Sequence, residues 1–176
     1  YQRLRHIKQT SNTSFVYPGA EHTRFQHCLG VAHLSLEFAQ KIQAKHPDLL
    51  SDHEVLLICL AGLCHDLGHG AYSHLYDNHI VKQFDPKSTF KHEDASYTIL
   101  QRIGVLSDED AIQVGKLIFG SPKQVPESLK DILVWTEQDY QKQFMYEIVS
   151  NERTGIDVDK FDYLKRDSHY TGIICA

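Results

Sequence analysis

The stretch Leu-Cys-His-Asp-Leu-Gly-His-Gly, residues 63–70, decides the fold of this chain. It closes an apolar run over residues 55–64 that is apolar on nearly every face, as in a buried central helix. His65 and Asp66 then place an imidazole and a carboxylate at the helix end, before Gly68 breaks the pattern. Burying these groups without a partner is costly. A divalent cation within reach of both would remove most of that cost, so the stretch predicts a metal site.

Composition places the chain among ordinary single-domain proteins. Of its 176 residues 41% are hydrophobic and 23% charged, and no run approaches the roughly 20 apolar residues of a membrane helix. A net charge of -5 argues against nucleic-acid binding through general basicity but leaves room for a local basic pocket. Four cysteines without Cys-x-x-Cys spacing indicate reduced thiols and an intracellular protein. Since the chain starts at Tyr1 and not at Met, we expect a piece of a longer polypeptide.

Helix signals dominate the rest of the chain. Thr23 can cap a helix over residues 24–44, and the pattern Ser51 to Glu54 is a capping box for the central helix. Further helices are predicted over residues 92–103, 108–119 and 157–167, a loop with a short helix over 68–88, and a loop with a helical turn over 120–143. Phe15-Val16-Tyr17, ended by Pro18-Gly19, predicts a short strand or extended arm. The expected fold is all-α with a short N-terminal strand or arm.

Four side chains can be assembled into one ligand set. His27 lies on the first turns of the 24–44 helix, His65 and Asp66 end the central helix, and Asp159 begins the last one. Mixed imidazole and carboxylate ligands suit Zn, Fe or Mn. His-Asp pairs are common and usually carry no function, so the buried helix end is what favours a metal here.

The last helix has two interpretations. Asp159, Tyr163, Arg166 and Asp167 share one face, which by default is a solvated stripe of helical salt bridges. Phe161 and Leu164 on the same helix are expected to pack inward, which would turn the polar face toward a site.

The ordered set His27, His65-Asp66 and Asp159 resembles the metal set of the HD-domain metal phosphohydrolases. Within this superfamily the chain resembles the eukaryotic SAM-and-HD-domain deoxynucleoside triphosphate triphosphohydrolases still more closely, through long blocks over residues 3–9, 16–31, 61–74 and 146–163. The resemblance implies an HD-domain helical fold over residues 1–176, with the C-terminal part of the catalytic region missing. It also implies hydrolysis of a dNTP to deoxynucleoside and inorganic triphosphate, with water attacking the α-phosphorus. The four ligands would hold Zn, Fe or Mn, with Mg possible at a second site.

By the same resemblance, other positions acquire roles. His92 would be catalytic, and His69 and His74 would touch the phosphates, His74 being our choice for the proton given to the departing 5'-oxygen. The substrate-binding residues would be Arg24 and Lys160 at the triphosphate, Gln9, Thr10, Tyr163 and Asp167 around the sugar, and Asp157. Gln2 and Arg5 would bind a regulatory guanine nucleotide that drives assembly into a homotetramer, although a solvated basic arm explains them nearly as well.

Departures and alternatives stay open. Thr10 stands where the family has Leu beside the sugar, which puts rejection of ribose in doubt. The chain could instead be another HD-type nucleotide phosphohydrolase, acting on monophosphates, cyclic nucleotides or a guanosine alarmone. It could also be a nucleotide-binding or single-stranded nucleic-acid-binding module without turnover. Residence in nucleus or cytoplasm and homo-oligomerisation of the full-length protein are expectations from the resemblance, and no membrane association is expected.

Overall fold

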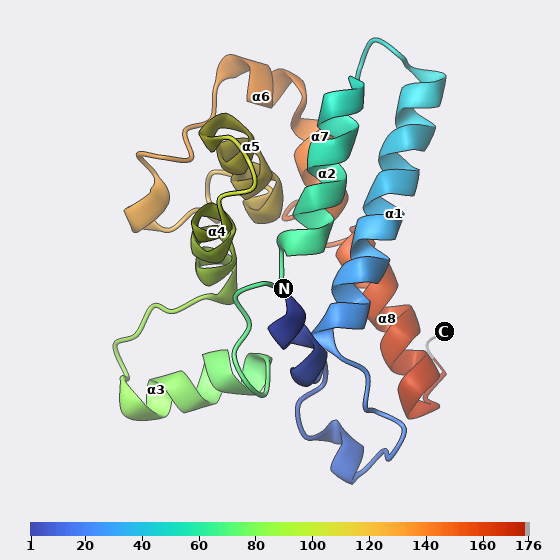
Figure 1. The fold of residues 1–176 in the computed structure, drawn as a ribbon, viewed down its shortest axis with the longest axis vertical. Coiled ribbons are helices and arrows are strands. Elements are labelled where there is room, and N and C mark those ends of the chain that lie inside the picture. Colours follow the sequence, from blue (N-terminus) through green and yellow to red (C-terminus); the bar gives the residue numbers. More distant parts are fainter. Residues whose placement is uncertain (175–176) are drawn as a thin grey trace.

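The computed structural model describes residues 1–174, which form a bundle of helices (Figure 1). Within this range the only β-type pairing is a single antiparallel bridge between Lys8 and Thr23, so the all-α prediction is confirmed. The elements, in chain order, are η1 (Gln2–His6), η2 (Thr13–Phe15), α1 (Arg24–Lys45), α2 (Asp52–Cys64), η3 (Tyr76–Ile80), α3 (Val81–Phe84), α4 (His92–Ile103), α5 (Asp108–Phe119), η4 (Glu127–Leu129), α6 (Glu137–Gln141), α7 (Gln143–Val149) and α8 (Val158–Thr171).

Helices α1 and α2 begin where their capping residues predict. The Gln26 side chain accepts a hydrogen bond from the Thr23 backbone N–H at 2.9 Å. At α2, Glu54 accepts from the Ser51 N–H at 2.8 Å, and the Ser51 hydroxyl accepts from the Glu54 N–H at 3.2 Å. Each box satisfies N–H groups that the helix itself leaves unpaired, so both starts are defined locally.

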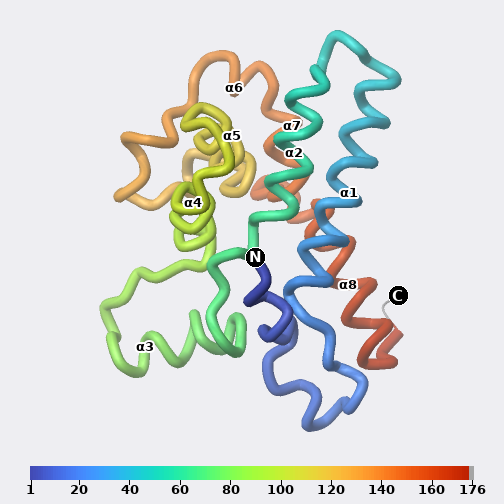
Figure 2. Tube along the Cα trace, viewed as in Figure 1, coloured from blue at the N-terminus to red at the C-terminus, as the bar shows by residue number. Residues whose placement is uncertain are grey.

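Helix α2 is the centre of the bundle. It packs against α1, α5 and α7, and Val55, Ile58 and Ala61 are all buried. Figure 2 shows the start of α1 between η1 and α8, both of which contact it. The start of α1 therefore lies next to α8. His65, which directly follows α2, also contacts α8 through Asp159, although these segments are far apart in sequence.

Residues 15–17 correct the prediction of a short strand or extended arm. Phe15 ends the 3-10 helix η2, and Val16 has helical backbone angles of φ -107° and ψ -38°. The side chains of Phe15 and Val16 are 84% and 75% exposed. A strand needs a paired neighbour, and within residues 1–174 the only bridge lies elsewhere, at Lys8 and Thr23.

Helix α8 also differs from expectation. Phe161 and Leu164, expected to pack inward, are 51% and 41% exposed, whereas Val158 and Asp162 are buried. A carboxylate thus occupies the inner face of α8 because, as shown below, it finds hydrogen-bond partners there.

The loops and cysteines follow the predictions where the structure describes them. Residues 68–88 hold η3 and α3, and residues 120–143 hold η4 and α6. Cys28, Cys59 and Cys64 are free thiols, and Cys175 lies outside the described residues. None of the described helices combines the length and the apolar character needed to cross a membrane.

Candidate metal centre and active site

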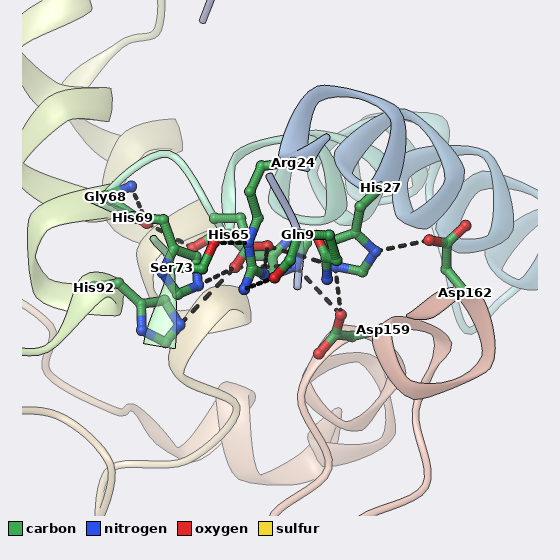
Figure 3. A network of polar contacts seen from close by, with 12 residues as sticks. Gln9, Arg24, His27, His65, Gly68, His69, Ser73, His92, Asp159 and Asp162 are labelled. Carbon is green, nitrogen blue, oxygen red and sulfur yellow. Dashed lines mark hydrogen bonds and ion pairs between the residues drawn. The ribbon is translucent and has the colours of Figure 1, made fainter. Parts of the chain in front are cut away.

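Three helices bring the predicted ligands together, as Figure 3 shows for the labelled residues. His27 comes from the second turn of α1, His65 and Asp66 from the turn after α2, and Asp159 from the first turn of α8. His27 Nε2 lies 2.9 Å from Asp159 Oδ1 and 3.4 Å from Asp66 Oδ2. His65 Nε2 lies 3.4 Å from Asp159 Oδ1 and 3.5 Å from Asp66 Oδ1. The four side chains converge as predicted.

The donor set fits a divalent metal. One ligand atom each of His27, His65 and Asp66 lies within 4.8 Å of the others, and all three residues are buried. His65 Nε2 is buried without a hydrogen-bond partner, which is unusual for a buried ring nitrogen. Two imidazoles with carboxylates are ligands that Zn, Fe and Mn accept. The residues present are therefore able to bind a divalent ion.

The electrostatics of the centre favour a positive charge. Burial works against the charged imidazolium of His65, but the nearby carboxylates of Asp66 and Asp159 outweigh it and raise the pKa to about 9. Burial also opposes ionisation of Asp66, yet Arg24 and then His65 hold its pKa well below the usual range. The site thus keeps its carboxylates ionised within a buried environment.

Outer contacts orient both imidazoles. His27 Nδ1 lies 2.7 Å from Asp162 Oδ2, which pairs in turn with Arg166, and His65 Nδ1 lies 2.8 Å from the carbonyl of Gly62. Such contacts fix the tautomer, so the Nε2 atoms face the centre. A Cβ at Gly30 would fall 1.9 Å from Asp162 Oδ1, so this approach of α8 to α1 requires glycine.

Arg24 neutralises the centre from within the protein. Its side chain is 3% exposed and its Nη1 pairs with Asp66. Nε donates to the Ser73 hydroxyl at 3.0 Å and Nη2 to the carbonyl of Gln9 at 3.5 Å. Ser73 itself donates to the carbonyl of Lys8 at 2.8 Å. Arg24, which was predicted to bind phosphate, thus contacts three other segments of the chain.

The three predicted histidines form a second cluster beside the metal ligands. The ring of His69 stacks on His92 at 3.7 Å between centroids and meets His74 edge-on at 4.8 Å. Asp77 Oδ2 lies 2.9 Å from His92 Nδ1 and 3.4 Å from His69 Nδ1. Burial lowers the pKa of His69 to about 3, despite the opposing carboxylate of Asp66, so this ring is neutral at physiological pH.

A cavity of about 510 Å³ opens over both clusters, within the usual range for a small-molecule site. Most predicted site residues line it, whereas Lys160, Gln2 and Arg5 do not, and His27 and His69 lie beneath the lining. Two lining residues hold buried polar atoms without a partner, Gln9 Oε1 and Thr10 Oγ1. The predicted residues in the lining are Gln9, Thr10, Arg24, His65, Asp66, His74, His92, Asp157, Asp159, Tyr163 and Asp167.

Asp157 contacts the backbone of Lys160 at the start of α8. Asp157 is the N-cap of α8, where its Oδ1 accepts from the Lys160 N–H and its Oδ2 from the Asn151 N–H, both at 2.9 Å. This cap holds the turn that carries Asp159.

Sequence reasoning missed Asp162, Asp77 and Ser73. Asp162 lies three residues after Asp159 on one helix, and Asp77 three after His74, so the spacing was visible. The roles of the two aspartates depend on which ring nitrogen they contact, and the role of Ser73 depends on its contact with Arg24. These contacts are visible only in three dimensions.

The fold and the site define the class of protein: a model of the HD domain family matches residues 24–166, and the chain belongs to this family. Among curated proteins it is similar to deoxynucleoside triphosphate triphosphohydrolase SAMHD1, with 39% identity in Homo sapiens over 98% of this chain and 30% of the relative. The Bos taurus protein is 38% identical over 98% and 32%. The SAMHD1 homolog of Dictyostelium discoideum is 38% identical over 98% of this chain and 32% of the relative. The chain thus spans about a third of the length of these relatives.

Proposed function

We propose that this chain is the metal-binding core of a deoxynucleoside triphosphate triphosphohydrolase, which cleaves a dNTP to deoxynucleoside and inorganic triphosphate. The observation that carries the proposal is the convergence of His27, His65, Asp66 and Asp159 beside a cavity that also exposes His74 and His92. The similarity to enzymes named for this reaction supports the substrate class.

The four converging residues would hold the ion, Zn, Fe or Mn. When bound, it supplies a Lewis acid for the α-phosphoryl group and lowers the pKa of a water that serves as nucleophile. Mg at a second site is also part of the family resemblance, but the second candidate group among the described residues, His69, His74, Asp77 and His92, offers three imidazoles and one carboxylate. This group does not fit Mg, which prefers oxygen ligands.

His74 is the residue that we propose to protonate the departing 5'-oxygen. It lines the cavity, and burial, reinforced by the charge of Arg24, lowers the pKa of its imidazole. A bound triphosphate brings negative charge next to the ring and favours its protonated form. The imidazole can therefore take up a proton as substrate binds and deliver it to the leaving group. His92, held by Asp77, would be a catalytic residue, and His69 and His74 would touch the phosphates.

The substrate would lie along the remaining lining residues. Arg24 and Lys160 would neutralise the triphosphate, Lys160 by extending its side chain from beyond the lining toward the cavity. Gln9 and Thr10 offer the unpartnered atoms Oε1 and Oγ1 to the sugar. Tyr163 and Asp167 face the same cavity from α8, and Asp157 holds the start of that helix.

Gln2 and Arg5 are proposed to bind a regulatory guanine nucleotide that drives assembly of the full-length protein into a homotetramer. Both side chains are exposed, Arg5 Nε donates to Gln2 Oε1 at 2.6 Å, and the guanidinium lies 3.5 Å from the centroid of the Phe25 ring. An intracellular location, in nucleus or cytoplasm, belongs to the same proposal.

Product analysis of the intact protein tests the proposal. Inorganic triphosphate released from dGTP supports it, whereas phosphate or pyrophosphate would indicate another HD phosphohydrolase. Replacing His65 and Asp66 by Ala should abolish both bound metal and turnover. A binding module without chemistry would show no turnover in the wild-type protein and would keep its nucleotide affinity in this variant. Parallel assays with GTP measure the effect of Thr10 on sugar selectivity.

A further inference from the structure

His22 is a buried residue outside the cavity that contacts two residues of the cavity wall. It precedes α1 and is 1% exposed. We propose that His22 is a positioning residue for the sugar side of the site, setting the recognition of the 3'-hydroxyl through Asp167 and Gln9. This inference rests on the proposed function, because it assigns those two residues to the sugar.

The His22 side chain holds Asp167. Its Nε2 lies 2.6 Å from Asp167 Oδ1, although the residues are 145 positions apart in sequence. Asp167 lines the cavity and its side chain is 32% exposed. A carboxylate has two oxygens, and the contact occupies one while it restricts rotation of the group. The other oxygen is then the acceptor that we assign to a sugar hydroxyl.

The orientation of the His22 ring is itself fixed. The ring stacks on Tyr170 at 4.6 Å between centroids with 16° between planes. The Tyr170 hydroxyl accepts from Gln26 Nε2 at 3.2 Å, so α1 and α8 together fix the position of the stack. His22 Nδ1 is buried without a hydrogen-bond partner. The Nε2–H tautomer, which donates to Asp167, leaves no unpaired N–H in this environment.

The His22 backbone holds the second sugar residue. Its carbonyl accepts a hydrogen bond from the Gln9 N–H at 3.0 Å. Gln9 lines the cavity and carries the unpartnered Oε1. One residue thus sets the spacing between an amide and a carboxylate that face the same cavity. An acceptor and an amide side by side suit a hydroxyl group, which both donates and accepts.

A pair of variants tests the side-chain contact in the intact protein. His22→Gln keeps an N–H donor near the position of Nε2, whereas the shorter His22→Asn does not reach it. The substrates are dGTP and 2',3'-dideoxy-GTP, which lacks the hydroxyl that Asp167 would accept from. His33→Asn is the matched control, because it is the same change at an exposed histidine of α1.

We expect His22→Asn to lower kcat/KM for dGTP about tenfold, mainly through KM, which is the usual effect of losing a hydrogen bond to a charged group. The value for dideoxy-GTP should change by less than about twofold, His22→Gln should restore most of the dGTP value, and His33→Asn should change neither substrate. Equal losses for both substrates would overturn the inference, because a purely structural role would affect both alike. Failure of a folded His22→Gln to restore dGTP would overturn it too.

Two further measurements keep the inference separate from other failures. If His22→Asn does not fold, Tyr170→Leu removes the ring that orients His22, and a selective loss for dGTP is again expected. If the wild-type protein releases no product from dGTP, the proposed function fails, and equilibrium binding decides instead. The ratio of dGTP to dideoxy-GTP affinity must then fall in His22→Asn, and an unchanged ratio counts against His22.

Discussion

Two buried polar clusters in this molecule both contain aspartate but serve different ends. In one, Lys116 and Asp139 are each 5% exposed and pair at 2.8 Å. The Tyr146 hydroxyl donates to the other oxygen of Asp139. The Thr136 N–H donates at 2.7 Å to the oxygen that pairs with Lys116. Burial opposes ionisation of Asp139, but Lys116 and Tyr146 outweigh it and hold its pKa well below the usual range. This cluster satisfies its own charges and joins α5, α6 and α7.

The cluster of His27, His65, Asp66 and Asp159 is linked by ion pairs but is not fully hydrogen-bonded. It gathers two imidazoles and two carboxylates, and His65 Nε2 is left without a hydrogen-bond partner. Buried polar groups are normally paired, and exceptions mark functional sites. We call the Lys116–Asp139 cluster closed, because all its charges are paired, and the cluster of predicted metal ligands open. A closed network stabilises the fold, whereas an open one is completed by a ligand.

The largest expected effect comes from removing a ligand of the open cluster. Asp159→Ala should lower bound metal and turnover more than a hundredfold, because even partners outside the metal ligands usually contribute ten- to a hundredfold. Metal content by mass spectrometry and dGTP turnover check this. The metal-free variant should still fold, since the Asp159 side chain is 33% exposed. Normal metal content in the variant would show that the two clusters do not differ in this way.

Removing the carboxylate charge of the closed cluster should lower stability and leave metal binding unchanged. Asp139→Asn leaves the buried ammonium of Lys116 without its counter-charge and should lower the free energy of unfolding by about 3 kcal/mol. Urea denaturation measures the loss, and metal content per folded molecule should stay at the wild-type value. A stable variant with depleted metal would contradict the division of roles.

Acid should weaken the closed cluster. The pKa of Asp139 is lower in the folded protein than its ordinary unfolded value of about 3.9. Its ionised form therefore adds stability above that pH, and this contribution is lost as pH falls toward the folded pKa. The difference in unfolding free energy between wild type and Asp139→Asn should be constant near neutrality and shrink below about pH 4. A difference that grows on acidification would show that the sign is wrong.

The smallest effect is expected at an exposed ion pair. Lys130 and Glu127 lie 2.6 Å apart with side chains 52% and 89% exposed. Lys130→Ala should change stability by less than about 0.5 kcal/mol, because water screens the pair. The same urea experiment provides this baseline. A loss comparable to that of Asp139→Asn would mean that burial does not explain the difference between the clusters.

Local signals were enough for much of the fold. The helix over residues 108–119 was predicted with the bounds of α5, because Ser107 caps its start and Gly120 ends it with a φ of 71°. The ligand set was predictable because its residues lie at helix ends, which packing brings together. Residues 15–17 failed because β-propensity cannot show whether a partner strand exists.

The side of the site away from the ion was harder to predict. Phe161 and Leu164 were expected inside because apolar residues usually are, yet Asp162 takes the inner face of α8 through its contact with His27. His22 acts through its contact with Asp167, and Asp77 through its contacts with His69 and His92. No spacing in the sequence reveals such contacts. Lys160 carries the right charge, but it is not among the residues that line the cavity.

Gly30 links the packing of the bundle to the chemistry of its centre. Any added carbon at this position would meet Asp162 at 1.9 Å and Arg166 at 2.5 Å. Even alanine would therefore displace the Asp162 side chain, which holds Nδ1 of His27. One methyl group behind the imidazole would thus loosen the orientation of a predicted ligand, without touching any atom that would bind the ion.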